Sequence, residues 1–162
     1  MLTTNARLDE QALFIQAAAG AALTTTVGDC VYASLKNYRK ATIVIDVLNA
    51  TTVTGGTVTL KQATAVAGTG EKALAFTRML ANVDVAASQA LAETAVTNNT
   101  FTTDTTNSKR LRYVIEVDAD MLDADNGFDC FRVDVTGMAS ATGTVGYILW
   151  GARYSGAGAL TD

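Results

Sequence analysis

Hydrophobic and polar side chains alternate along successive segments of residues 111–154. Residues 111–117 read LRYVIEV, residues 128–135 read FDCFRVDV, and residues 144–151 read TVGYILWG. A period of two is typical of β-strands that bury one face and expose the other. Because an acidic turn and a small-residue turn separate the segments, they predict a three-stranded β-meander. Residues 145–150 are apolar on both faces, so we expect this strand to lie centrally or against a partner.

Shorter segments of the same kind precede the meander. Residues 27–35, 38–47 and 57–65 predict three further strands, and residues 49–56 supply a turn in which the pair Gly55–Gly56 is able to take positive φ. Residues 82–104 are rich in Ala, Thr and Asn with little periodicity, which predicts a long surface excursion. Short strands joined by such turns predict an all-β fold, an antiparallel β-sandwich or a jelly-roll-like barrel.

The two ends of the chain lack this pattern. We expect residues 1–23 to be an extended N-terminal arm that orders on contact with a partner, residues 24–154 to form the β-sandwich domain, and residues 155–162 to be a flexible tail. Within the arm, the alanines of residues 8–23 fit a short helix, whereas Gly20 and the TTTV that follows favour a loop or an edge strand. The pattern leaves these alternatives open.

The composition argues against catalysis. The chain of 162 residues contains no histidine, so it lacks the side chain that titrates near neutrality and that ligates metals most often. Its serine, threonine and cysteine hydroxyls and thiols therefore have no histidine to activate them, and no Gly-x-Ser-x-Gly elbow is present. We expect no enzymatic activity, no cofactor and no metal site.

The charge pattern bears on partners. A net charge of −4 should repel nucleic acid, and no segment approaches the roughly 20 apolar residues of a membrane span. The basic residues gather in two trios: Lys36, Arg39 and Lys40, and Lys109, Arg110 and Arg112. A solvated strand end or an acidic protein partner explains each trio better than a phosphate does.

The acidic segment 118–129 is the most site-like stretch. Residues 123–127 read DADNG and approach the start of a calcium loop, but the glycine comes one position early and no glutamate closes the loop. We favour a short helical turn at residues 120–124 that Asn126 and Gly127 end, with an irregular cation site as the alternative. The glycines of AGTGEK at 67–72 lack the Gly-Lys-Ser/Thr of a phosphate loop, so they predict a hairpin turn.

The two cysteines match no metal-binding spacing. Cys30 and Cys130 lie about a hundred residues apart. We expect thiols in a reducing compartment, and a disulfide across the sheet is the alternative.

Four segments carry a resemblance to a known group of proteins. They are ATIVIDV at 41–47, VTLKQAT at 58–64 with its AGTG turn, FDCFRVDVTG at 128–137, and the closing strand 145–151 followed by Arg153 and Tyr154. In kind and order they resemble small virion proteins of tailed bacteriophages, of the capsid decoration or cement type. The N-terminal arm and residues 82–104 are not part of the resemblance.

The resemblance implies a β-sandwich that binds the outside of a capsid, with the major capsid protein as partner and the virion as its location. Another virion component, in the tail or at the head–tail junction, is the first alternative. A carbohydrate-binding β-sandwich is the second, with Trp150 and Tyr154 as its aromatic candidates.

Two groups of residues are the candidate interfaces. We expect a homo-oligomer, a trimer ahead of a dimer, because capsid lattices offer binding sites on symmetry axes. The apolar strand supplies the first group, Ile148 and Trp150 with Tyr154 after them, for contact between subunits or sheets. Lys36, Arg39 and Lys40 form the second group, for contact with capsid carboxylates.

Overall fold

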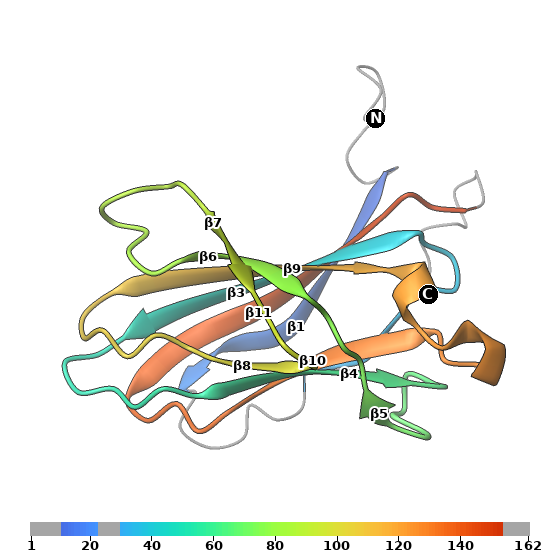
Figure 1. Cartoon of the computed structure of the whole chain (residues 1–162), viewed down its shortest axis with the longest axis horizontal. Coiled ribbons are helices and arrows are strands. Elements are labelled where there is room, and N and C mark those ends of the chain that lie inside the picture. The colour runs from blue at the N-terminus through green and yellow to red at the C-terminus, as the bar shows by residue number, and fades with distance from the viewer. Residues whose placement is uncertain (1–10, 23–29, 154–162) are drawn as a thin grey trace.

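Two antiparallel β-sheets pack face to face in the computed structural model, which describes residues 11–22 and 30–153 (Figure 1). The six-stranded sheet has the order β1-β11-β3-β9-β6-β7, and the five-stranded sheet has the order β2-β10-β4-β5 with β8 beside β4. The strands are β1 (Ala12–Ala22), β2 (Ala33–Ser34), β3 (Lys40–Asn49), β4 (Thr57–Ala63), β5 (Lys72–Ala73), β6 (Arg78–Asn82), β7 (Ala92–Ala95), β8 (Thr100–Thr102), β9 (Arg110–Asp118), β10 (Cys130–Thr136) and β11 (Ala141–Trp150). The predicted all-β sandwich is confirmed.

The predicted meander is wrong, although its three strands exist. β9 and β11 both pair with β3 in the six-stranded sheet, whereas β10 lies in the other sheet between β2 and β4. The chain therefore crosses from one sheet to the other and back. Alternation shows only that a strand buries one of its two faces. Each sheet of a sandwich buries its inner face, so the alternation does not tell which of the two sheets a strand belongs to.

The core lies between the sheets and joins them through tyrosine. Phe131 of β10 meets Tyr147 of β11 with ring centroids 5.0 Å apart. The Tyr147 hydroxyl accepts a hydrogen bond from the Val133 backbone N–H at 3.1 Å, so a side chain of one sheet binds the backbone of the other. Burial of this hydroxyl raises the pKa of Tyr147 well above its usual value. A buried tyrosine of this kind packs its ring and still satisfies its polar end.

β11 lies centrally, as predicted, between β1 and β3. Val145, Tyr147 and Leu149 are buried and face the other sheet. Ile148 and Trp150 alternate with them and are half-buried on the outer side. Contact between the sheets therefore explains the apolar residues on the inner face of β11. It does not explain those on the outer face.

Residues 12–22 form the edge strand β1 and correct the predicted arm over this stretch. β1 pairs with β11, with Phe14 opposite Ile148, and its register shifts after Gln16 and again after Ala18. Leu13 and Ile15 pack against the core cluster, so a period of two is present but hidden among alanines. Of the two alternatives for this stretch, the edge strand is correct and the helix is wrong. Residues 1–10, the tail 155–162 and Tyr154 lie outside the described residues.

Residues 82–104 are more regular than predicted, because they contain β7 and β8. Asn82 anchors the turn between β6 and β7 by donating from its side-chain amide to the carbonyls of Ser88 and Ala90, at 2.7 and 2.8 Å. All four residues of β7 are exposed, so this strand carries no hydrophobic alternation that could have revealed it.

The acidic segment forms two 3-10 turns, Ala119–Met121 and Ala124–Asn126, rather than the single turn predicted at 120–124. Gly127 ends the second turn in the left-handed conformation with φ of 79°. The Asp123 carboxylate pairs with Lys72 and accepts from the Asn126 amide. No group of three or more potential metal ligands occurs among residues 11–22 and 30–153.

Two further features complete the description. Cys30 and Cys130 are buried thiols that no disulfide joins. In the part of the chain that the structure describes, no helix has the length and apolar character needed to cross a membrane.

Gly56 is required for space and not for its backbone angle. Among the described residues, the glycines with positive φ are Gly68, Gly70, Gly127, Gly137 and Gly151, so Gly55 and Gly56 do not use the positive φ that they are able to take. A Cβ on Gly56 would lie 2.2 Å from the Met138 side chain and 2.7 Å from the Thr136 carbonyl oxygen. The chain can close over buried Met138 only because residue 56 has no side chain.

We therefore predict that Gly56→Ala lowers the free energy of unfolding by about 1–3 kcal/mol, the usual range for overpacking. Gly146→Ala is the matched control, because its Cβ would meet only the Ile15 carbonyl oxygen at 3.8 Å. It should change stability by less than about 0.5 kcal/mol. Urea unfolding followed by tryptophan fluorescence measures both, and equal midpoints for the two variants would contradict the steric explanation.

Candidate docking face

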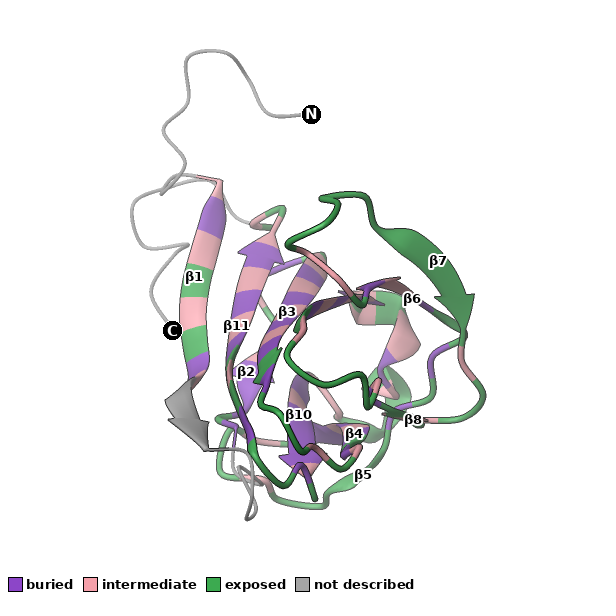
Figure 2. Ribbon diagram, turned by 90° about the vertical axis from the view of Figure 1, so that its left-hand side faces the viewer, coloured by how far each residue is buried: buried purple, intermediate pink, exposed green. Residues whose placement is uncertain are grey.

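An apolar band crosses the outer face of the six-stranded sheet. It consists of Phe14 on β1, Ile148 on β11, Val44 on β3, Val114 on β9 and Leu80 on β6. Register places Phe14 opposite Ile148, and Val114 opposite both Val44 and Leu80. Phe14 is 55% exposed and the other four are half-buried, so the band remains open to solvent. In Figure 2, buried and intermediate positions alternate along β11 and β3, and β1 also carries exposed positions.

Local sequence explains why the band lies where it does. Inward positions of β3 and β9, such as Ile43 and Ile115, are fully buried, so the residues between them must face outward. In each strand one outward position is a valine, and pairing aligns Val44 with Val114. β-Branched side chains fit a half-buried pleated surface, so these valines favour the strand conformation even though they do not pack in the core.

Paired charges border the band on both sides. On one side Glu116 lies 2.7 Å from Lys40 and 3.3 Å from Arg78. These cations hold the pKa of Glu116 below its usual value, Lys40 most of all. On the other side the Asp46 carboxylate accepts from Nε and Nη2 of Arg112 at 2.6 and 3.0 Å. An apolar centre with a polar rim is the usual anatomy of a protein–protein interface.

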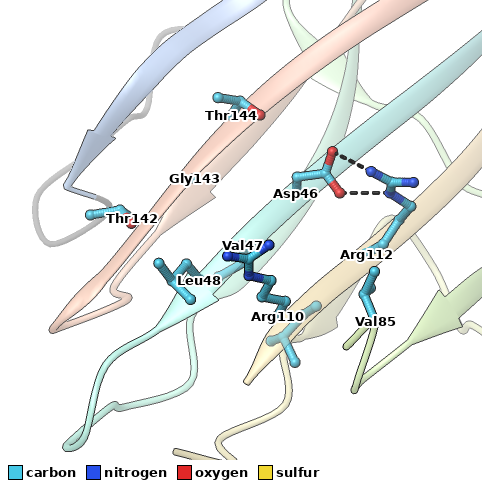
Figure 3. Close-up of a pocket in the computed structure, with 10 residues that line it drawn as sticks. Asp46, Val47, Leu48, Val85, Arg110, Arg112, Thr142, Gly143 and Thr144 are labelled. Atoms are coloured by element: carbon cyan, nitrogen blue, oxygen red, sulfur yellow. Dashed lines mark hydrogen bonds and ion pairs between the residues drawn. The ribbon is translucent and has the colours of Figure 1, made fainter. Parts of the chain in front are cut away.

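A hollow of about 640 Å³ lies on the same face, and the Asp46–Arg112 pair forms part of its lining (Figure 3). The rest of the lining includes Leu48, Val85, Arg110, Thr142, Gly143 and Thr144. The backbone N–H of Val85 donates to the Arg110 carbonyl at 2.9 Å, which fixes the loop after β6 as one wall. Gly143 and the two short threonines leave the opposite side open.

The structure brings most of the predicted interface residues to one end of this face. Trp150 is the register partner of Lys40, and its carbonyl accepts from the Arg39 backbone N–H at 3.1 Å. Its indole Nε1 donates to the Thr42 hydroxyl at 3.0 Å, so the ring is held against the sheet near Ile148. Arg39 is exposed at the start of β3, Lys36 is exposed on the turn before it, and Tyr154 lies outside the described residues.

Sequence reasoning predicted only Ile148 among the band residues and missed the other four, Phe14, Val44, Val114 and Leu80. The available signal was a valine among the outward positions of an alternating strand, as in LRYVIEV. Single apolar residues on exposed faces are common, however. Only the register, which pairs Phe14 with Ile148 and Val114 with both Val44 and Leu80, brings them together on one face.

The outer face of the other sheet is closed by its own charges. Glu71 receives a hydrogen bond of 2.5 Å from the Tyr32 hydroxyl, and its carboxylate lies 2.5 Å from Lys61 Nζ and 2.9 Å from Arg132 Nη2. Asp134 lies 2.8 Å from Lys61 Nζ and 2.9 Å from Arg132 Nε. The guanidinium also stacks 4.9 Å from the Tyr32 ring centre. This network pairs two cations with two carboxylates within the domain.

Comparisons with known proteins were made for the sequence and the structure. No protein-family model and no curated protein matches the sequence. The crystal structure of the SPBc2 prophage-derived protein YomS aligns with 86% of this chain and 93% of its own, at 13% identity and a TM-score of 0.46. A likeness of this degree transfers neither function nor site residues to this chain.

The Glu71 network predicts a pH-dependent contribution to stability. The hydrogen bond from Lys61, followed by that from Tyr32, lowers the pKa of Glu71 below its ordinary 4.5. The contribution of Glu71 to the free energy of unfolding is therefore complete at pH values above its pKa in the unfolded chain. It is lost as the pH falls through the lower pKa that Glu71 has in the folded protein. At pH 7 we expect Glu71→Gln to reduce the free energy of unfolding by about 1 kcal/mol.

The measurement is urea unfolding of wild type and Glu71→Gln from pH 7 to pH 3. The difference between them should shrink below pH 4.5. Glu93→Gln is the control, because Glu93 is 62% exposed and pairs only with exposed Arg78, so its loss should change little. A Glu71→Gln deficit that stays constant down to pH 3 would contradict the assigned role.

Proposed function

We propose that this protein is a structural virion protein that binds the outside of a bacteriophage capsid and decorates or cements the shell. The outer face of the six-stranded sheet is the proposed docking face. The observation that carries the proposal is the apolar band left open between two rows of paired charges. The order of strand segments that resembles phage decoration proteins supports the same assignment.

Apolar contact and charge have separate roles in this proposal. Burying the apolar band contributes a favourable free energy of about 25 cal/mol for each Å² of apolar surface removed from water. This term supplies most of the affinity. Lys36 and Arg39 are exposed and make no ion pair with any described residue, so capsid carboxylates are suitable partners for them. Each such pair contributes about 0–1 kcal/mol, and attachment should weaken only moderately with salt. The net charge of −4 favours the exterior, away from packaged DNA.

Cementing requires no chemistry. A molecule that contacts several capsid subunits binds the intact shell better than its separated parts, and so stabilises the shell by mass action. Many weak copies on one lattice add their effects. We propose a homo-oligomer, a trimer ahead of a dimer, because a symmetric assembly matches the symmetry axes of a capsid lattice.

Phe14 provides a test of the docking face with little risk to the fold, since it is 55% exposed. We expect Phe14→Lys to keep the stability of the wild type and to lower the number of copies per shell at limiting protein. Val66→Lys is the matched control, because Val66 is 52% exposed on the turn after β4, outside the proposed face. Quantitative gel analysis of purified particles measures occupancy, and equal occupancy for both variants would exclude the band from attachment.

Shell stabilisation is tested separately by heating particles with and without the protein and following DNA release with an intercalating dye. We expect release at a higher temperature when the protein is bound, because separation of subunits then also breaks its contacts. Identical release temperatures at full occupancy would exclude a cementing role and leave decoration alone. Absence of the protein from purified virions would exclude both.

A further inference from the structure

Two of the three cations of the second basic trio are neutralised within the domain, and the third is not. Lys109 pairs with the Asp84 carboxylate, and Arg112 pairs with Asp46 through two hydrogen bonds. The hydrogen bonds that Arg112 donates to Asp46 raise the pKa of Arg112 still further. Arg110 is exposed and makes no ion pair with any residue that the structure describes. One positive charge is thus left over at the hollow.

The surroundings of Arg110 are apolar on one side and hydroxylic on the other. Figure 3 shows its side chain reaching from β9 towards β3, where Leu48 stands beside it. Leu48 is 48% exposed, although it is a large apolar residue at the end of a strand. Val85 forms the wall behind, and Thr142 and Thr144 of β11 line the other side of the hollow. A cation without an ion pair among the described residues, an apolar wall and two hydroxyls therefore converge on one concave space, which the mutually neutralised Asp46–Arg112 pair also lines.

We propose that this hollow binds a segment of the partner protein in which a carboxylate lies beside an apolar side chain. Arg110 pairs with the carboxylate, and Leu48 and Val85 contact the apolar group. The inference rests on the proposed function, because it identifies what the docking face recognises. A planar guanidinium matches a carboxylate with two parallel hydrogen bonds, which gives direction to a contact that is otherwise apolar.

Charge excludes a polyanion as the intended occupant. The carboxylates of Asp46 and Asp84 accompany Arg112 and Lys109, so the region as a whole carries little net positive charge. A nucleic acid or a phosphate cluster needs several uncompensated cations, whereas one carboxylate needs only one. The open apolar surface of Leu48 would also gain nothing from a phosphate.

The test uses the complete chain, labelled with 15N, and hexanoate as a probe that joins a carboxylate to an apolar tail. We expect amide shifts to concentrate at Leu48, Val85, Arg110 and residues 142–144. Arg110→Gln should weaken hexanoate binding by about threefold to tenfold, the range for one partly enclosed ion pair. Lys72→Gln removes the same charge on the other sheet and should leave the affinity unchanged.

Three further probes separate the contributions. Hexan-1-ol lacks the charge and acetate lacks the tail, so both should bind more weakly than hexanoate. Hexyl phosphate tests the phosphate alternative. The inference is overturned by equal affinity for hexan-1-ol or acetate, by tighter binding of hexyl phosphate, or by unchanged affinity in Arg110→Gln.

Particles then distinguish failure of this inference from failure of the proposed function. If Arg110→Gln protein occupies shells as fully as wild type while Phe14→Lys does not, decoration stands and the hollow is not the recognition site. If hexanoate binds as expected but wild-type protein does not attach to shells, the ligand class of the hollow stands and the proposed function fails.

Discussion

The alternation of side chains in β3, β9 and β11 determines both surfaces of the six-stranded sheet. These central strands bury Ile43, Ile115 and Tyr147 almost completely against the second sheet. A register slip of one residue would exchange the buried and exposed sets, so the core fixes the pairing with little tolerance. The same register then also determines which residues face outward and which of them lie opposite one another. The apolar band, its bordering ion pairs and the hollow are consequences of a register that the interior enforces.

The two outer faces of the sandwich manage exposed groups in different ways. On the five-stranded sheet, Lys61 and Arg132 meet Glu71 and Asp134 within the domain, and Tyr32 covers the guanidinium. On the six-stranded sheet, the ion pairs lie at the sides and valines occupy the middle. A closed polar network has little to gain from a partner, because a partner would have to replace bonds already made. An open apolar band gains from any surface that excludes water from it. This asymmetry is the physical reason to assign docking to one face.

The sequence revealed the strands with long, regular alternation and missed what depends on pairing. ATIVIDV and FDCFRVDV were predicted as strands because half their residues pack in the core. The change of sheet between β9 and β10 was not predictable, since each strand buries one face in either arrangement. The sequence left β1 open between a helix and an edge strand because its alanines obscure the alternation, and Gly56 was interpreted only as a turn residue although steric contact with Met138 explains it. The band joins strands from across the sequence, so no local pattern contains it.

An exposed apolar surface is normally a hazard for a protein made in many copies, since it promotes association with any other apolar surface. Two properties of this chain limit that hazard. A net charge of −4 makes copies repel one another at long range. The band is also narrow and is bordered by two ion pairs, Glu116 with Lys40 and Asp46 with Arg112. An unsuitable partner would remove water from these ion pairs without supplying new hydrogen bonds in its place. A partner of matching shape avoids that penalty. On the proposed docking face, the bordering charges would therefore supply specificity and the band would supply affinity.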